Sequence, residues 1–312
     1  MAPDTQLLAY SPDAIAHAAA LIRGGQPVAV PSETVYGLAA DATSGAAVAA
    51  IYEAKGRPAF NPLIVHVLDR AQAEAIADLP APAVRLAEAF WPGPLTLVAP
   101  LRPGAPIASL ATAGLATVAL RAPAHPAMRD LLAACARPLA APSANASGTI
   151  SPTRAGHVLR SLGGRIPLVI DGGACAIGIE STIVAVEADH LRLLRPGPIA
   201  PAPLAEAAGL PFGEGGHAGI EAPGQLAQHY APAKPLRLDA HAARAGEWLI
   251  GFGPVRGPVS LSERGDLVEA AARLFDLLHA ADAGPMERIA VAPIPSVGLG
   301  AAINDRLRRA AA

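Results

Sequence analysis

The sequence predicts an α/β fold: a large, twisted, mixed sheet in the first two thirds and a small Rossmann-like α/β unit at the C-terminus. Short apolar runs of strand length alternate with alanine-rich stretches of helix length over about the first 200 residues. The composition then changes near residue 209, and a shorter strand and helix series follows. A chain of 312 residues is long enough for two such domains.

The first predicted helix covers residues 11–23, because Ser11 suits the N-cap, Pro12 suits the first helical position, and Gly24 and Gly25 end it. Further helices are expected over 45–55, 82–90 and 151–162. Strands are expected over 27–30, 63–67, 95–99, 117–121, 139–142, 168–171, 182–186 and 191–194.

Glycine and proline mark a loop or linker after residue 209. Beyond it, strands are expected over 236–238, 248–252 and 288–292, and helices over 266–281 and 300–309. This order predicts parallel strands, although no GxGxxG fingerprint is present. We therefore expect a domain over 1–208, a linker over 209–233 that covers the site, and a second domain over 234–312.

The composition limits the class of protein. Hydrophobic residues make up 52% of the chain and charged residues 16%, which is enough to bury a sizeable core. The two cysteines, Cys135 and Cys175, cannot form a disulfide framework, and they lack the partners of a zinc site. We expect no metal bound by protein ligands. With no signal-peptide pattern and no long apolar run, we expect a soluble cytoplasmic protein without a membrane partner.

The net charge is -2, and residues 1–205 carry 14 basic and 14 acidic side chains. This balance argues against the broad basic footprint with which proteins bind a nucleic-acid backbone. It leaves room for a local cavity in which positive charge binds a small anion.

Lys55 stands out because only two of the 24 basic residues are lysine, the other being Lys234. A lysine ammonium is a compact point charge with three donors, unlike the planar fork of arginine. Lys55 lies beside Arg57 and Asn61 in a turn that contains glycine and two prolines. Such a cluster can hold a polyphosphate, and it can equally be a solvated basic turn.

Three further side chains lie at strand ends or in a turn. Thr34 belongs to a polar turn that follows the first strand, His66 lies in an apolar strand, and Arg121 ends another strand. The hydroxyl and the imidazole suit a small polar ligand, and the guanidinium suits a carboxylate. The alternatives are a self-capping turn, a core histidine and a surface arginine.

The segment over 142–153 is rich in small hydroxylated residues and runs from a strand into a predicted helix start. Backbone N–H groups there, with the hydroxyls of Ser143 and Ser151, can form an anion site, or the segment can be a loop with an N-cap. Ser181 precedes a strand, and Arg195 ends the next one. Since no Walker A, GxSxG or HExxH pattern is present, the expected chemistry is positioning and charge neutralisation around a phosphoryl group.

Taken together, these segments resemble the YrdC-like family of threonylcarbamoyl-AMP synthases. The motifs that carry the resemblance occur in family order at 31–38, 55–63, His66, 90–96, 141–148, 151–153, 180–184 and 194–197. The motif at 229–232 and the small C-terminal domain are similar to the longer, two-domain members, although this second domain is short for that type.

The resemblance implies a twisted α/β domain with a basic cavity and the synthesis of threonylcarbamoyl-AMP and pyrophosphate from L-threonine, bicarbonate or CO2, and ATP. Mg²⁺ would accompany ATP. The product would pass to the tRNA threonylcarbamoyl-transferase machinery, which modifies the adenosine beside the anticodon, and a weak contact with tRNA is compatible with this role.

The resemblance also implies residue roles. L-threonine would be contacted by Thr34, His66, Arg121, Ala141 and Ser181. ATP would be contacted by Lys55, Arg57, Asn61, Thr117, Ser143, Ser151 and Arg195, and Tyr230 would reach back from the linker to cover it. Lys55 and Arg57 would be the catalytic residues, because they offset charge on the phosphates.

Two other functions compete with this interpretation. The first is an RNA-binding module that uses the same basic cavity, against which the charge balance and the lack of interleaved aromatic residues argue. The second is a carbamoyl-transfer enzyme of hydrogenase maturation, which has a related domain but normally carries further zinc-finger-like modules for which this chain has neither room nor cysteines.

Overall fold

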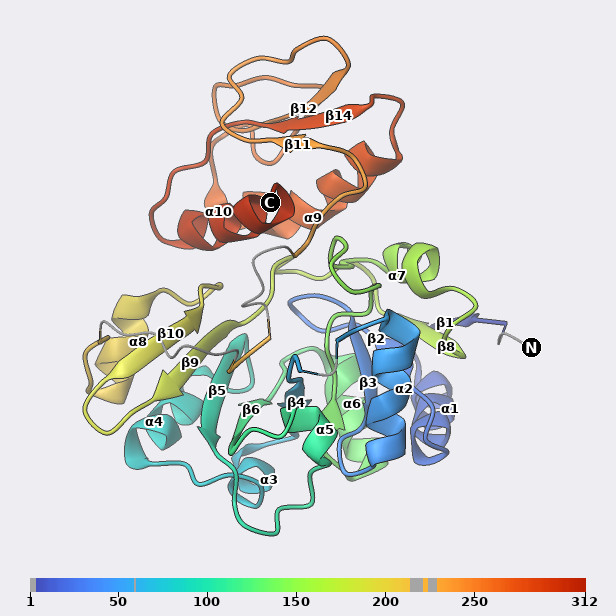
Figure 1. The fold of residues 1–312 in the computed structure, drawn as a ribbon, viewed down its shortest axis with the longest axis vertical. Coiled ribbons are helices and arrows are strands. Elements are labelled where there is room, and N and C mark those ends of the chain that lie inside the picture. Colours follow the sequence, from blue (N-terminus) through green and yellow to red (C-terminus); the bar gives the residue numbers. More distant parts are fainter. Residues whose placement is uncertain (1–3, 59, 214–220, 224–228) are drawn as a thin grey trace.

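A ten-stranded mixed sheet forms the centre of the larger of two units in the computed structural model, which describes residues 4–58, 60–213, 221–223 and 229–312 (Figure 1). Its strand order is β1-β8-β2-β3-β7-β4-β6-β5-β9-β10. The bounds are β1 (Gln6–Ala9), β2 (Val28–Val30), β3 (Gly37–Asp41), β4 (Ile64–His66), β5 (Leu95–Pro100), β6 (Thr117–Arg121), β7 (Leu139–Ala140), β8 (Leu168–Asp171), β9 (Thr182–Val186) and β10 (Leu191–Arg195). Both parallel and antiparallel pairs occur in it, so the predicted mixed sheet is confirmed.

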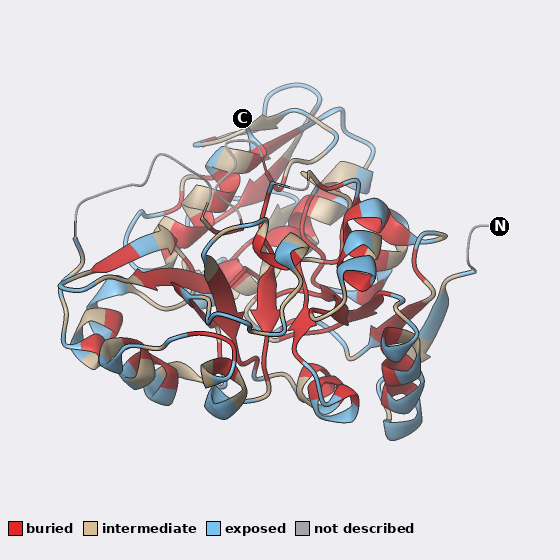
Figure 2. Cartoon of the chain, turned by 60° about the horizontal axis from the view of Figure 1, so that its bottom comes forward, coloured by how far each residue is buried: buried red, intermediate tan, exposed pale blue. Residues whose placement is uncertain are grey.

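Helices cover both faces of this sheet, since alternate strand residues point to opposite sides. Val28 and Val30 pack in one core cluster with α1 (Pro12–Arg23) and α6 (Pro126–Cys135), whereas Ala29 packs in another with α2 (Gly45–Lys55). Figure 2 shows most strand segments as buried, whereas the edge strand β1 is largely exposed. The remaining helices of this unit are α3 (Arg70–Glu74), α4 (Ala81–Phe90), α5 (Ser109–Thr112), α7 (Ala155–Leu162) and α8 (Pro201–Ala208).

The smaller unit is a four-stranded parallel sheet of order β11-β14-β12-β13, with helices α9 and α10 between it and the larger unit (Figure 1). The parallel arrangement confirms the prediction. The bounds are β11 (Leu236–Arg237), β12 (Glu247–Gly251), β13 (Val259–Ser260), α9 (Leu267–Ala283), β14 (Arg288–Val291) and α10 (Leu299–Ala310).

One hydrophobic cluster joins the two units. Val35, Ile150 and Ile179 of the larger unit pack with Tyr230 and with the buried faces of α9 and α10. The smaller unit is therefore packed on the larger one through a continuous core. No helix in the described part of the chain combines the length and the hydropathy needed to cross a bilayer.

The elements expected from the sequence are present, with shifts of a few residues at most of their ends. One predicted helix start is wrong by four residues: the helix expected to start at Ser151 begins at Ala155, and Arg154 is its N-cap. Patterns of the sequence predict no element where β1, β3, α3, α5, α6, α8 and β13 lie. Residues 214–220 and 224–228 of the expected linker lie outside the described residues.

Candidate active site

The candidate site is a small cavity where the ends of several strands of the large sheet meet the linker. It has a volume of about 50 Å³, which is room for a few waters in this conformation. Eight of the predicted site residues line it: Thr34, Arg57, His66, Arg121, Ala141, Ser143, Arg195 and Tyr230. The structure therefore brings together residues from widely separated parts of the chain.

Arg121 lies at the end of β6, opposite His66 of the parallel strand β4. Its guanidinium donates to the Thr34 hydroxyl at 2.9 Å and forms an ion pair with Glu33 at 2.6 Å. Burial would raise the pKa of Glu33, but the charge of Arg121 and the contact with it lower that pKa overall. An arginine and a carboxylate placed side by side can bind the two charged ends of an amino acid.

His66 is a neutral imidazole. Burial, and then the nearby charge of Arg121, lower its pKa to about 3. Its Nδ1 has no hydrogen-bond partner among the described residues, although it is shielded from solvent. A buried ring nitrogen without a partner is suited to a polar group of a ligand, so the alternative of a satisfied core histidine is not what the structure shows.

Lys55 is the last residue of α2, and Gly56 ends the helix in the left-handed conformation. The ammonium is buried and donates to the carbonyl oxygens of Ser143 and Asn145, each at 2.5 Å. Desolvation, and then Arg57, lower the pKa of Lys55 well below its usual value. The turn at Lys55 is therefore not solvated, and the lysine holds the loop that carries Ser143 against α2.

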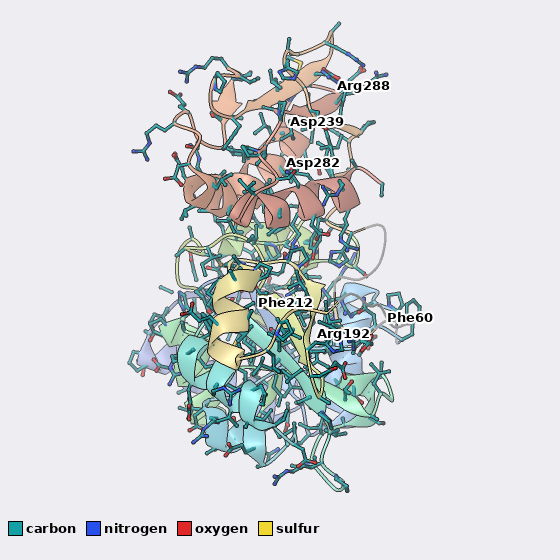
Figure 3. The ribbon with its side chains drawn as sticks, turned by 90° about the vertical axis from the view of Figure 1, so that its left-hand side faces the viewer. Phe60, Arg192, Phe212, Asp239, Asp282 and Arg288 are labelled. Carbon is teal, nitrogen blue, oxygen red and sulfur yellow. The ribbon has the colours of Figure 1, made fainter. Side chains whose placement is uncertain are left out.

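Arg57 and Asn61 lie in the loop that follows. Arg57 donates to the carbonyl of Asn61 at 3.3 Å and to that of Pro62 at 2.9 Å, and burial lowers its pKa to about 10. The side-chain amide of Asn61 is buried, yet neither of its polar atoms has a hydrogen-bond partner among the described residues. Phe60, between them, is 59% exposed and projects outward (Figure 3).

Arg195 ends β10 and anchors Ser181. It donates to the carbonyl of Ser181 at 3.0 Å and to its hydroxyl at 3.0 Å, while the Thr96 hydroxyl lies 2.7 Å from the same hydroxyl. Desolvation lowers the pKa of Arg195. Ser181 is therefore hydrogen-bonded to Arg195, which lines the cavity, although Ser181 itself does not line it.

Thr117 and Ser151 also lie outside the lining. Thr117 begins β6, opposite Pro100 and four residues before Arg121. Ser151 precedes α7 by four residues, and its hydroxyl donates to Glu180 Oε1 at 2.5 Å. The expected helix N-terminus at Ser151 is therefore wrong, because no helix starts there. The Ser151 hydroxyl proton is directed at the Glu180 carboxylate.

The linker enters the site at His229 and Tyr230. Tyr230 has a φ of 66°, which is unusual for a residue with a side chain, and its buried hydroxyl has no hydrogen-bond partner among the described residues. Its ring contacts Phe275, with centroids 5.6 Å apart, and the guanidinium of Arg306 lies 5.4 Å from the ring centroid. Tyr230 thus fills the space between the cavity and the smaller unit.

Positive charge prevails around this cavity. Lys55, Arg57, Arg121, Arg195 and Arg306 are buried, against the carboxylates of Glu33, Glu180 and Asp305. Buried cations without equal counter-charge raise the free energy of the empty site and favour a bound polyanion. The same burial argues against the alternative of an RNA-binding module, because a phosphate backbone would not reach these groups.

No group of three or more His, Cys, Asp or Glu side chains among the described residues is arranged to hold a metal. The two carboxylates nearest the cavity, Glu33 and Glu180, are both engaged by arginines. A Mg²⁺ ion at this site would therefore be held mainly by the phosphate oxygens of a nucleotide with which it arrives.

A larger cavity of about 550 Å³ lies between α7, α9 and the linker, where His157 stacks on His279. Its rim carries Arg160 and Asp282, which balance each other in charge. It lacks the clustered cations and the unpartnered polar atoms that the described residues place at the smaller cavity, so size alone does not make it the better candidate.

Several residues of the site were not singled out by sequence reasoning. Ser32, Glu180 and His229 line the cavity, Glu33 pairs with Arg121, and Arg306 pairs with Glu180. Glu33 and Glu180 adjoin the predicted residues Thr34 and Ser181, which was a usable signal. Nothing in the sequence marks Arg306 as a site residue, because it is one of several arginines on a terminal helix.

Comparison with known proteins gives the family. Residues 20–197 match the Sua5_yciO_yrdC family, described as "Telomere recombination", and residues 199–312 match the threonylcarbamoyl-AMP synthase C-terminal domain. The threonylcarbamoyl-AMP synthase of Bacillus subtilis is 40% identical over 98% of this chain and 95% of its own length. That of Pyrococcus abyssi is 40% identical over 94% and 92%.

The crystal structure of P. abyssi Sua5 complexed with L-threonine has the same fold, with a TM-score of 0.89 and 36% identity, and the match covers 98% of each chain. The likeness extends over both units. The chain therefore belongs to the threonylcarbamoyl-AMP synthase family, in the form that carries both domains.

Proposed function

We propose that this protein makes threonylcarbamoyl-AMP and pyrophosphate from L-threonine, bicarbonate or CO2, and ATP, for threonylcarbamoylation of tRNA. The observation that carries the proposal is the cavity in which Arg121 and His66 lie beside the cations Arg57 and Arg195, with Glu33 paired to Arg121. Near full-length likeness to two proteins named threonylcarbamoyl-AMP synthase supports it.

L-threonine would occupy the part of the cavity around Arg121. The guanidinium would take the carboxylate in place of its contact with Glu33, and Glu33 would then face the amino group. The hydroxyl of threonine would be within reach of the neutral His66, and Thr34 and Ala141 would complete the contacts from the lining. Ser181, which is hydrogen-bonded to Arg195, would contact threonine from outside the present lining. The match to a Sua5 structure complexed with L-threonine supports L-threonine as a substrate.

ATP would bind along Arg57, Asn61, Ser143 and Arg195, with Thr117 and Ser151 as further contacts. Arg57 and Arg195 each have a lowered pKa, mainly through desolvation, and a bound phosphate would favour their charged forms. Lys55 uses two of its three N–H groups on backbone carbonyls, which leaves one for a phosphate oxygen.

The reaction needs no covalent intermediate on the protein. The threonine ammonium first loses a proton to solvent, and the amine nitrogen then forms a bond to the carbon of CO2 while one C=O π bond opens onto oxygen. The nitrogen loses a second proton to solvent, which leaves a carbamate. A carbamate oxygen then forms a bond to the α-phosphorus of ATP, and the bond between that phosphorus and the bridging oxygen breaks, so that pyrophosphate leaves. Arg57, Arg195 and Lys55 would stabilise the negative charge that moves onto pyrophosphate. Mg²⁺, where bound to the phosphates, supplies further neutralisation of that charge.

The end of the linker at His229 and Tyr230 would close the site. In this conformation Tyr230 and His229 fill much of the space that a nucleotide needs, since the remaining volume is about 50 Å³. ATP entry therefore requires the linker to move, and its return would shield the carbamate and the mixed anhydride from water. The product would then pass to the tRNA threonylcarbamoyl-transferase machinery, and direct contact with tRNA would be weak.

Pyrophosphate release with each substrate omitted in turn tests this function. We expect release only when L-threonine, bicarbonate and ATP are all present, and a large loss when L-serine replaces threonine because the methyl group beside the hydroxyl is missing. Pyrophosphate release that does not depend on threonine or on bicarbonate would contradict the proposal.

A further inference from the structure

Arg306, on helix α10 of the smaller unit, is wholly buried although it is charged. Its Nε donates to Glu180 Oε2 at 2.8 Å, and one terminal nitrogen donates to the carbonyl of Pro196 at 2.8 Å. The same nitrogen also contacts Asp305 on its own helix at 2.9 Å. A buried guanidinium needs such partners, so these contacts fix where the Glu180 carboxylate lies.

Glu180 connects Arg306 to Ser151. One carboxylate oxygen receives Arg306, and the other receives the hydroxyl of Ser151 at 2.5 Å. An ionised carboxylate only accepts hydrogen bonds, so the proton of Ser151 points to Glu180, and its oxygen can only accept from other groups. The state of Glu180 thus decides which hydrogen bonds Ser151 can offer to a ligand.

The smaller unit holds Ser151 by a second contact. His279 of α9 donates from Nε2 to the backbone carbonyl of Ser151 at 3.1 Å. Burial, and then His157, lower the pKa of His279 to about 3, so its imidazole is neutral and the contact does not change near neutral pH. Both the hydroxyl and the carbonyl of one residue in the larger unit therefore depend on side chains of α9 and α10.

We propose that Arg306 is a positioning residue for the nucleotide: acting through Glu180, it fixes the orientation of the Ser151 hydroxyl, so that the smaller domain completes the ATP site of the larger one. This inference rests on the proposed function, since it assigns Ser151 to the nucleotide. It gives the smaller domain a role in the reaction that is separate from covering the site.

The charge on Glu180 depends on four groups that face it. Arg306 comes from α10, Arg195 from β10, and His229 and Tyr230 from the linker. Burial alone would raise the pKa of Glu180, but Arg306 and Arg195 lower it below its usual value. His229 has a pKa of about 3, mainly through burial, and stays neutral. Without Arg306, only the charge of Arg195 and the hydrogen bond from Ser151 would oppose the burial, so the pKa of Glu180 would rise.

The test compares Arg306→Met, Glu180→Gln and the double variant with Arg308→Met. Arg308 lies on the same helix but is exposed, so its replacement removes the same charge without touching Glu180. We expect Arg306→Met to raise the KM for ATP about tenfold or more, from the unpaired buried carboxylate, with a smaller change in the KM for threonine. The double variant should recover most of this loss, because a neutral amide still accepts from Ser151 and needs no counter-charge.

The pH profile separates positioning from simple loss of stability. In Arg306→Met, the KM for ATP should fall as the pH is lowered across the range in which the protein stays folded, since protonation removes the charge of Glu180 that Arg306 no longer pairs. Wild type and Arg308→Met should lack this trend, because their Glu180 keeps a low pKa and stays ionised over that range. The double variant should lack it as well, since glutamine does not titrate.

Circular dichroism and thermal unfolding would accompany each variant. If Arg306→Met fails to fold, the KM for ATP of Glu180→Gln is compared with that of the double variant. The two values should differ, because the introduced amide faces the N–H donors of Arg306 in the single variant only. Equal KM values for ATP in those two variants, or pH profiles of Arg306→Met and Arg308→Met that coincide, would overturn the proposal. Wild-type pyrophosphate release with all three substrates tests the proposed function separately.

Discussion

The two lysines of this arginine-rich chain make similar contacts at different places. Lys55 donates to the carbonyls of Ser143 and Asn145 beside the cavity. Lys234 donates to the carbonyls of Ala281 and Gly284 at 3.1 and 2.6 Å, where it caps the end of α9. In both, a compact ammonium bridges two carbonyl oxygens, which the planar guanidinium of arginine does not do in the same space.

This similarity gives a matched pair of substitutions. Lys55→Arg should lower kcat/KM for ATP by about ten- to a hundredfold, because about 1.5–3 kcal/mol of charge-assisted hydrogen bonding is disturbed beside the phosphates. Lys55→Ala should lower it further. Lys234→Arg should affect the midpoint of thermal unfolding and leave the KM for ATP unchanged. Steady-state kinetics on both variants would decide, and equal effects on the KM would show that Lys55 has only a structural role.

At the level of single residues, a site residue could be predicted from the sequence most readily where its side chain lies at the end of a strand. Arg121 and His66 end neighbouring parallel strands, so their meeting follows from the alternation of strands and helices. The contact of Ser151 with Glu180 and the pairing of Glu180 with Arg306 could not be predicted in this way. They depend on how the smaller unit packs on the larger one, and no local pattern reports that packing.

Among the elements, the loop over 177–180 shows how closely the two units approach. Gly178 has a φ of 79°, and a Cβ at this position would overlap the backbone of α9 at Ala271 and Ala272. Glycine is therefore required for two reasons, its backbone conformation and the lack of space. The loop leads directly into Glu180 and Ser181, so its position also sets theirs.

A substitution by alanine separates these two reasons. Gly164 has a φ of 77°, and no atom lies within 4 Å of the place that a Cβ would take, so Gly164→Ala should cost only the backbone strain, about 1–2 kcal/mol. Gly178→Ala should lower the midpoint of thermal unfolding more, because α9 must also move. It should also raise the KM for ATP. Equal midpoints for the two variants would show that α9 does not press on this loop.

The elements themselves were largely predictable, for identifiable reasons. Helix α2 was predicted over residues 45–55 from an alanine-rich stretch, and its bounds match. Strand β3, Gly37–Asp41, was missed because its alanines carry little strand preference, although its position in the middle of the sheet makes it fully buried. Helix α7 was placed too early, since the proline at 152 resembles a helix start.

On the scale of the whole molecule, the two units form one functional object. A continuous hydrophobic cluster joins them, Tyr230 lies between them, and Arg306 and His279 reach from the smaller unit to Glu180 and Ser151. The larger unit supplies Arg57, Arg121 and Arg195 from separate strand ends and loops. The arrangement predicts that ATP and L-threonine bind together in the cavity beneath the linker.

A crystal structure with L-threonine and a non-hydrolysable ATP analogue tests this claim most directly. We expect the α-phosphorus to lie near Arg57 and Arg195, with the threonine carboxylate on Arg121. A carbamate on the threonine nitrogen would then stand within about 3–3.5 Å of that phosphorus. Nucleotide bound instead in the larger cavity between α7 and α9, away from these arginines, would contradict it.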